Sequence, residues 1–180
     1  GVERFRALFR PLLFDVFHLP VPDVTRLPAG VSADGGADYY LGGVEKLLQE
    51  RHHEIAALVI EPLVQAAAGI VMHPAGFLHG VRRLTRKFEV LLIADEVAVG
   101  MGRTGTMFAC DQEGVVPDFL CLAKGLTGGY LPLAATLTSH DIFQAFLGPY
   151  EEQKTFCHGH TYGGNPLGAA AALATLDLFD

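Results

Sequence analysis

The stretch VLLIADEVAVGMGRTG, residues 90–105, opens with an apolar run that ends in two acids and is followed by a glycine cluster. A second apolar run, AALVIEP at residues 56–62, precedes it in the chain. Between the two runs, apolar residues recur at helical spacing: Phe77, Val81, Leu84 and Phe88. Apolar runs without polar alternation are typical of strands in a parallel sheet covered by helices. Residues 59–95 therefore predict one complete strand–helix–strand unit in an α/β fold.

Neighbouring segments extend this pattern in both directions. DFLCLAK at 118–124 and LAATLTS at 133–139 predict two further strands. Asn165 and Pro166 predict the N-cap and first turn of an Ala/Leu helix that runs to Phe179. A helix is also indicated before the first apolar run, by Val44, Leu47, Leu48 and Ile55.

The beginning of the chain has a different character. Residues 12–19 predict a strand, and the Pro/Gly-rich stretch at 19–36 predicts a long loop. The chain begins at Gly1 without Met and enters apolar segments almost at once, so we expect it to be a piece of a longer protein.

Composition limits the classes of function. With 180 residues, of which 50% are hydrophobic, the chain can form one sizeable core, which fits one domain or most of one. A net charge of −7 argues against binding to nucleic acid or to an anionic membrane surface. The three cysteines lack Cys-x-x-Cys spacing, so we expect neither a disulfide framework nor a zinc ribbon, and a cytoplasmic location. No apolar run approaches the roughly 20 residues of a membrane helix, and no signal peptide is evident.

Charged side chains follow the predicted strands at the point where each strand ends. These are Glu61, Asp95 and Lys124. In parallel sheets, ligands sit beyond the carboxyl ends of the strands. The sequence therefore predicts a site at this edge of the sheet.

Two nucleotide-binding motifs resemble parts of residues 90–105. LLIADE is similar to the segment whose Asp holds Mg²⁺ in NTPases, which requires a loop ending in Gly-Lys-Ser or Gly-Lys-Thr. None of the four lysines follows a glycine, so this alternative depends on a loop outside the 180 residues. Gly100, Gly102 and Gly105 spell the dinucleotide fingerprint, which must open a helix. The following residues, TMFACDQEGVVP, have little helical periodicity, which argues against that alternative.

A third interpretation combines Lys124 with Asp95, which is 29 residues earlier. Burial at a strand end would lower the pKa of a lysine and make its amine nucleophilic, which suits Schiff-base chemistry. Pyridoxal phosphate needs such a lysine to hold its aldehyde as an imine, and an acid against its pyridine nitrogen. The alternatives are that Lys124 extends to solvent or pairs with a surface acid, and that Asp95 caps a turn.

Three stretches carry a resemblance to a known family. LLIADEVAVGMGRTG, FLCLAKGLTGG and HGHTYGGNPLGAAAALATL resemble the class III (ornithine-type) aminotransferases, which use pyridoxal phosphate. HHEIAALVIEPLVQAAAGI fits the same family, so the resemblance covers nearly the whole chain. Many members have Gln two residues after the Asp-Glu pair, whereas this chain has Ala98.

The resemblance implies a fold and an assembly. It implies the large domain of a fold type I pyridoxal-phosphate transferase, of which residues 1–180 would be the central part. A phosphate-binding loop would precede this part, and a small domain with a substrate-carboxylate Arg would follow it. The resemblance also implies a homodimer with shared active sites that acts on small molecules.

The resemblance further implies roles for individual residues. Lys124 would bind the cofactor aldehyde, and Asp95 would pair with its pyridine nitrogen. Thr161 would donate to the cofactor phosphate of the neighbouring subunit, Gly159 would touch the keto substrate, and His160 would lie against the cofactor.

Other positions receive weaker assignments. Glu61 and Gln65 match a family motif near the active site, although Ala66 replaces the usual Gly. Glu61 would orient neighbouring groups, or be a simple acid at a strand end. His158 and His160 form a His-x-His pair without an evident third ligand, so no metal site is expected.

Two classes of function remain open from the sequence. The first is a working aminotransferase in its full-length form. The second is a non-catalytic or truncated relative that acts as a binding piece. The presence of both Asp95 and Lys124 favours the first.

Overall fold

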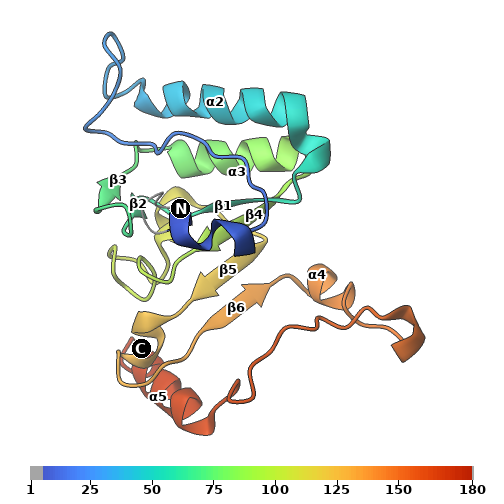
Figure 1. The fold of residues 1–180 in the computed structure, drawn as a ribbon. Helices are drawn as coiled ribbons and strands as arrows, with labels where there is room; N and C mark the ends of the chain where they lie inside the picture. Colours follow the sequence, from blue (N-terminus) through green and yellow to red (C-terminus); the bar gives the residue numbers. More distant parts are fainter. Residues whose placement is uncertain (1–5, 180) are drawn as a thin grey trace.

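A central sheet with helices on one side forms the core of the computed structural model, which describes residues 6–179 (Figure 1). The main sheet has the order β1-β4-β5-β6. Its strands are β1 (Ala57–Ile60), β4 (Leu91–Asp95), β5 (Phe119–Leu122) and β6 (Ala135–Thr138). The first three run parallel to one another, and β6 runs antiparallel to β5. A separate two-stranded hairpin is formed by β2 (Val64–Gln65) and β3 (Val71–Met72).

Helices and short 3₁₀ turns connect these strands. The α-helices are α2 (Gly36–Arg51), α3 (Phe77–Lys87), α4 (His140–Gln144) and α5 (Pro166–Leu176). The 3₁₀ segments are η1 (Ala7–Leu12), η2 (His52–Glu54), η3 (Ala109–Glu113), η4 (Lys124–Thr127) and η5 (Tyr150–Glu152). None of the helices within residues 6–179 is long and apolar enough to cross a membrane.

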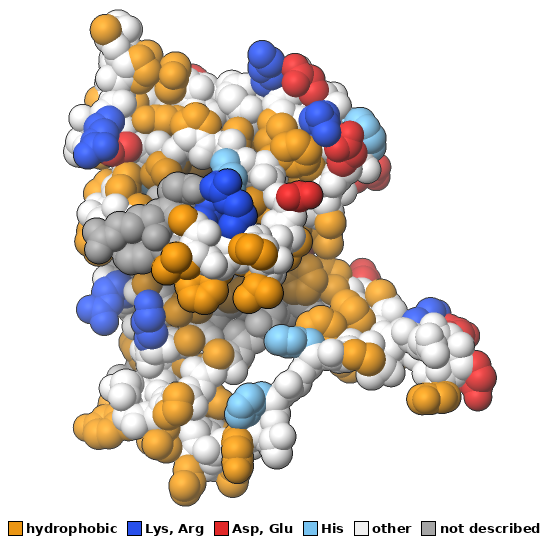
Figure 2. Space-filling model, in the orientation of Figure 1, with side chains coloured by type: hydrophobic (Ala, Val, Ile, Leu, Met, Phe, Trp, Pro, Cys, Tyr) orange, Lys and Arg blue, Asp and Glu red, His pale blue; other side chains and the backbone are white. Residues whose placement is uncertain are grey.

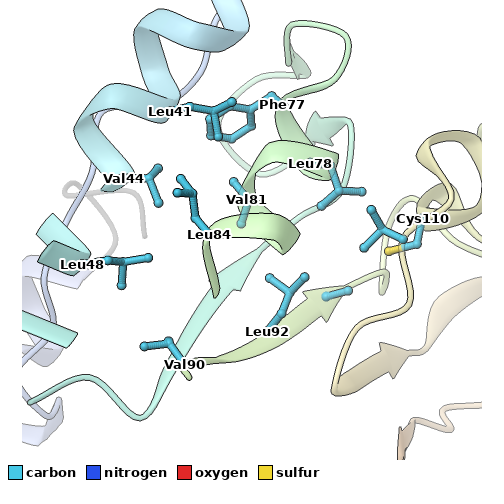
Figure 3. Packing of buried hydrophobic residues seen from close by; sticks show 12 residues of the cluster. Leu41, Val44, Leu48, Phe77, Leu78, Val81, Leu84, Val90, Leu92 and Cys110 are labelled. Atoms are coloured by element: carbon cyan, nitrogen blue, oxygen red, sulfur yellow. The ribbon is translucent and has the colours of Figure 1, made fainter. Parts of the chain in front are cut away.

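The predicted strand–helix–strand unit is present as β1, α3 and β4. Helix α3 places Phe77, Val81 and Leu84 on its buried face, four and three residues apart, as the helical period requires. Figure 3 shows these side chains between α2 and β4, where Leu48 and Leu92 complete the cluster. This packing fixes the position of the strand that ends in Asp95.

One carboxylate ties α3 to the entry of β5. Arg82 donates two hydrogen bonds to Asp118, with Nη1–Oδ2 and Nη2–Oδ1 distances of 2.6 and 3.0 Å. The backbone N–H of Leu92 donates to the same carboxylate at 2.7 Å. Partial burial acts to raise the pKa of Asp118, but the hydrogen bonds from Arg82 and Leu92 outweigh it and hold the pKa below its usual value. The carboxylate therefore fixes β4 and β5 relative to α3.

The structure corrects two predictions about the chain. The strand predicted at residues 12–19 is wrong, because 7–12 form η1 and 13–23 have no regular structure. The apolar side chains of this segment, including Leu12 and Phe14, are exposed and pair with no strand. The second concerns the predicted cover of helices, which lies on only one face of the sheet at β1 within the described residues. Val59 is 64% exposed, whereas its neighbours Leu58 and Ile60 pack against the buried cluster on the side of α3.

Apolar surface is also abundant near the end of the chain. Figure 2 shows apolar side chains gathered around α5 and over the arm that leads to it. Among the exposed residues are Tyr130, Tyr162, Leu173 and Leu178. The helix predicted from Asn165 is present as α5, and the Asn165 side chain accepts a hydrogen bond from Leu167 N.

Candidate active site

Asp95 is the last residue of β4 and is half-buried. Alternation along the strand puts Leu92 and Ala94, both fully buried, on the side of α3, so Asp95 faces the opposite side of the sheet. Its Oδ1 accepts a hydrogen bond from Val97 N at 3.1 Å. No described residue donates to its second oxygen, Oδ2. Asp95 Oδ1 therefore stabilises the turn that follows β4, and Oδ2 can accept a hydrogen bond from a ligand.

Lys124 lies on the neighbouring strand end. Cys121 of β5 pairs in register with Asp95, and Lys124 begins the η4 turn three residues later. Lys124 has φ = 46°, a left-handed conformation that is strained for a side chain other than glycine. Such outliers concentrate at functional sites and cost about 1–3 kcal/mol. Lys124 is exposed in the described chain, so the burial on which the nucleophile prediction rested is not seen here.

Two close contacts hold the turn at Lys124. A Cβ placed on Gly125 would lie 2.8 Å from the Cβ of Met101, so only glycine fits where the two loops meet. Helix α5 also packs against η4, where Thr175 comes near Gly128. The position of Lys124 is therefore set by the glycine-rich loop 97–105 and by α5.

A hollow of about 1200 Å³ opens beside this turn. Its walls include Lys124, Arg103, His160, Tyr130 and Phe179. The hollow has ample room for a small-molecule ligand. Arg103 supplies a second positive charge at its wall, and this residue was not predicted from the sequence. The Gly-x-Gly-x-x-Gly stretch in which it lies was the available signal.

Of the three residues Gly159, His160 and Thr161, only one lines this hollow. His160 lines it, whereas Gly159 and Thr161 do not, and both are exposed. Tyr162 N donates to His160 Nδ1 at 3.1 Å, which leaves Nε2 as the ring atom available to a ligand. The structure therefore brings His160 to Lys124 but does not bring Gly159, Thr161 or Asp95 to the wall of the same hollow.

Glu61 and Gln65 lie at the end of β1 and in the β2–β3 hairpin. Glu61 Oε2 accepts from Ala66 N at 2.9 Å, so its observed contact is with the hairpin backbone. Gln65 Oε1 is buried and has no hydrogen-bond partner among the described residues. A smaller hollow of about 580 Å³ lies between this hairpin and the glycine-rich loop, and Arg103 reaches it too.

The described residues contain no metal cluster, and the buried Cys110 thiol is held in its protonated form. Within residues 6–179 no group of three His, Cys, Asp or Glu side chains could hold a metal ion. Burial and the carboxylate of Glu96 raise the pKa of the Cys110 thiol far above its usual value, so this thiol stays protonated.

The chain belongs to a known family. Residues 2–180 match the model of the aminotransferase class-III family, and the chain belongs to this family. The adenosylmethionine-8-amino-7-oxononanoate aminotransferase of Nitratidesulfovibrio vulgaris is 54% identical over 180 residues, which are 100% of this chain and 33% of that relative. The chain spans about a third to two fifths of the length of such relatives.

Solved structures agree with this assignment. The crystal structure of adenosylmethionine-8-amino-7-oxononanoate aminotransferase from Methanocaldococcus jannaschii has a TM-score of 0.86 and 42% identity. The match covers 99% of this chain and 39% of the Methanocaldococcus jannaschii chain. The omega transaminase from Pseudomonas jessenii in complex with PMP has a TM-score of 0.82 and 35% identity. The match covers 90% of this chain and 36% of that one. The mostly parallel sheet predicted from the sequence is therefore the sheet of the transaminase fold.

Proposed function

We propose that the full-length protein is a pyridoxal-phosphate-dependent aminotransferase of biotin biosynthesis. It would transfer an amino group from S-adenosylmethionine to 8-amino-7-oxononanoate and give 7,8-diaminononanoate. The choice of substrates rests on the names of the relatives that are 41–54% identical to this chain. Ala98, at a position where many class III members have Gln, is consistent with that choice.

The strand-end residues fit the cofactor. Asp95 keeps Oδ2 without a donor among the described residues, so it can accept a hydrogen bond from a protonated ring nitrogen. Lys124 is on the adjacent strand end beside a hollow of about 1200 Å³, and its amine is exposed to a ligand there. The similar Pseudomonas jessenii structure holds PMP, the aminated form of pyridoxal phosphate. Bound pyridoxal phosphate supplies an electron-withdrawing ring for carbanion chemistry.

The residues of the chain then have separate tasks. Lys124 would hold the cofactor covalently, and its released amine would take the proton from the substrate Cα. Asp95 would keep the ring nitrogen protonated by its negative charge. His160 Nε2 and the Arg103 guanidinium would face anionic groups of cofactor or substrate, because both line the hollow.

Lys124 provides the direct test of cofactor binding. Borohydride reduction of the full-length protein with pyridoxal phosphate, followed by peptide mass mapping, should place the cofactor mass on Lys124. The control is Lys154, which ion-pairs with Glu152 at the surface and should stay unmodified. Cofactor mass on another lysine, or on none, would contradict the assignment.

Substrate identity needs its own measurement. Purified full-length protein should form 7,8-diaminononanoate from 8-amino-7-oxononanoate, and S-adenosylmethionine should support this better than lysine does. Turnover of other ω-amines without turnover of 8-amino-7-oxononanoate would instead place the protein among general class III ω-aminotransferases. Cofactor binding without any transamination would indicate a non-catalytic relative.

The exposed segment of Gly159 and Thr161 supports a shared site in a homodimer. Both residues are exposed and neither lines the hollow beside Lys124, whereas a two-fold axis can place one subunit's loop in the other's site. In this proposal Thr161 binds the cofactor phosphate of the partner and Gly159 touches its keto substrate. Asp95 and Lys124 remain in the home subunit, and the site uses small molecules only.

Mixed dimers distinguish a shared site from a private one. Two inactive full-length variants, Lys124→Ala and Thr161→Val, are unfolded together and allowed to reassociate. About half of randomly paired dimers are mixed, and each has one intact site, so about a quarter of wild-type activity should return. If activity stays at the level of the separate variants, Thr161 serves its own subunit. Each variant mixed with itself is the control.

A further inference from the structure

Glu96 is a buried acid that the proposed chemistry does not use. Its side chain is 1% exposed, although it immediately follows Asp95. Charged residues are almost never fully buried unless they are paired. Within residues 6–179 no Lys, Arg or His forms an ion pair with it. Some other set of contacts must stabilise this carboxylate.

Backbone N–H groups provide these contacts. Ala109 N donates to Glu96 Oε2 and Cys110 N donates to Oε1, each at 2.8 Å. Both N–H groups belong to the first two residues of η3. The first N–H groups of a helix have no acceptor within the helix, so they are available to the carboxylate. The carboxylate thus holds the far end of the loop that begins at Val97.

The backbone of Glu96 is also held on both sides. Its N–H donates to Cys121 O at 2.9 Å, which continues the pairing of β4 with β5 one residue past Asp95. Its C=O accepts from Gly100 N at 2.9 Å. One residue therefore joins the strand that carries Asp95, the strand that leads to Lys124, and the loop that carries Arg103.

Loop 97–105 transmits this connection to the turn at Lys124. Met101 of the loop touches Gly125, the residue after Lys124. Gly100 is packed so closely that an added Cβ would lie 2.9 Å from Glu96 O and 3.0 Å from Oε2. A displacement of the Glu96 carboxylate would therefore move the loop on which both Asp95 and Lys124 depend.

We propose that Glu96 is a positioning residue, whose carboxylate sets the Asp95 carboxylate and the Lys124 amine in register for the same cofactor. The proposal rests on the proposed aminotransferase function. Glu96 touches neither cofactor nor substrate in this scheme. It acts through two neighbours whose geometry must be held to about 0.5 Å for productive chemistry.

Glu96→Gln in the full-length protein tests this role. The amide offers one acceptor oxygen and turns an NH₂ toward the second backbone N–H, so one of the two hydrogen bonds is lost. The matched control is Glu113→Gln. Glu113 accepts from Gly76 N and His79 N, both at 2.8 Å, at the start of α3 and away from Asp95 and Lys124.

Three readouts separate positioning from simple stability. They are the melting temperature, the rate of the half-reaction with the amino donor, and the pH dependence of the absorbance of bound pyridoxal phosphate. Glu96→Gln should slow the half-reaction about 10- to 100-fold, as loss of orienting hydrogen bonds does at metal ligands. It should also displace toward lower pH the part of the absorbance curve that reports the ring nitrogen, because a misplaced Asp95 stabilises the protonated nitrogen less and lowers its pKa, as Asp95→Asn would. Glu113→Gln should lower only the melting temperature.

The outcomes are distinguishable. If Glu96→Gln behaves like Glu113→Gln, Glu96 is merely structural and the proposal is wrong. If the wild-type protein binds no pyridoxal phosphate, the proposed function fails and this inference fails with it. If Glu96→Gln does not fold, Gly100→Ala replaces it, because the added methyl displaces Glu96 without removing its charge. An unchanged half-reaction rate and absorbance curve in Gly100→Ala would overturn the proposal.

Discussion

Helices α2 and α3 are in close contact where Gly80 meets Leu41, and replacing this glycine tests the packing beneath the site. Alanine is a better helix former than glycine by about 1 kcal/mol, so Gly80→Ala would stabilise an isolated helix. In the structure, however, the new Cβ would lie 2.3 Å from Leu41 Cδ1 and 3.0 Å from Leu41 Cγ. Real Cβ atoms do not approach this closely, so Leu41 must move.

The two effects have opposite signs, and their magnitudes decide the outcome. Leu41 is 8% exposed and packs in the cluster that includes Phe77 and Val81. Forcing extra carbon into such packing costs about 1–3 kcal/mol. Subtracting the gain in helix propensity leaves a net loss of up to about 2 kcal/mol. We therefore expect Gly80→Ala to lower the stability of the protein despite its better propensity.

A matched control exists on the facing helix. Gly43 lies inside α2, is exposed, and has no atom within 4 Å of an added Cβ. Gly43→Ala should therefore raise stability by up to about 1 kcal/mol. Thermal unfolding of the full-length variants, followed by circular dichroism, measures both changes. A change of 1 kcal/mol corresponds to a shift of about 2–4 °C in a domain of this size.

A double variant separates the clash between residue 80 and Leu41 from the effect of helix propensity. Leu41→Ala alone should cost about 2–5 kcal/mol, because it leaves a cavity between the helices. In the Leu41→Ala background the clash is gone, so adding Gly80→Ala should raise the melting temperature. If Gly80→Ala raises the melting temperature in both backgrounds, the helices are not in contact at this point and the reasoning is refuted.

Three further predictions concern the site and the pH dependence of stability. Asp95→Asn should keep cofactor binding but slow the half-reaction with the amino donor, since the ring nitrogen no longer stays protonated, and near-normal single-turnover rates would show that Asp95 is only a turn cap. Gly125→Ala should impair pyridoxal phosphate binding, because its Cβ would lie 2.8 Å from Met101 Cβ, whereas Gly43→Ala, with open space around its Cβ and far from the site, should leave cofactor binding unchanged. Burial lowers the pKa of His73 from 6.5 to about 4, so its contribution to stability is full above pH 6.5 and is lost as the pH falls toward 4. His73→Phe should flatten the fall in melting temperature over that range, and parallel curves for the two proteins would contradict this.

Much of the sheet could be predicted because its strands bury one face against α3. The periodicity of Phe77, Val81 and Leu84 identifies α3, and the apolar runs identify β1, β4 and β5. The direction of β6 could not be read from its composition, since antiparallel and parallel edge strands can share it. The β2–β3 hairpin has strands of two residues each, which is too short for any periodicity to appear.

Residues 12–19 show why apolar character alone misleads. A strand requires a partner for its backbone N–H and C=O groups, and no described strand pairs with this segment. Helix α4 was not predicted, because with only five residues it is too short to show an apolar periodicity. Its signal was Ser139, whose side chain accepts from Ile142 N as an N-cap.

The candidate site was predicted from chemistry, and its organisation depends on strand geometry. Asp95 and Glu96 are adjacent acids with the same charge, so composition gives no reason to assign them different tasks. Alternation along β4 sends them to opposite sides of the sheet. Asp95 points toward the uncovered face, and no residue within 6–179 donates to its Oδ2. Glu96 points into the protein and accepts hydrogen bonds from two backbone N–H groups.

This division depends on register. A slip of one residue between β4 and β5 would exchange the two faces, so that Glu96 would lie where Asp95 lies and Asp95 would be buried. The pairing of Asp95 with Cys121 and the bond from Glu96 N to Cys121 O both oppose such a slip. So does Asp118, which is bonded to Arg82 and to Leu92 N at the other end of the strands. The spacing of Asp95 and Lys124 in the sequence becomes a site only because both ends of this strand pair are fixed.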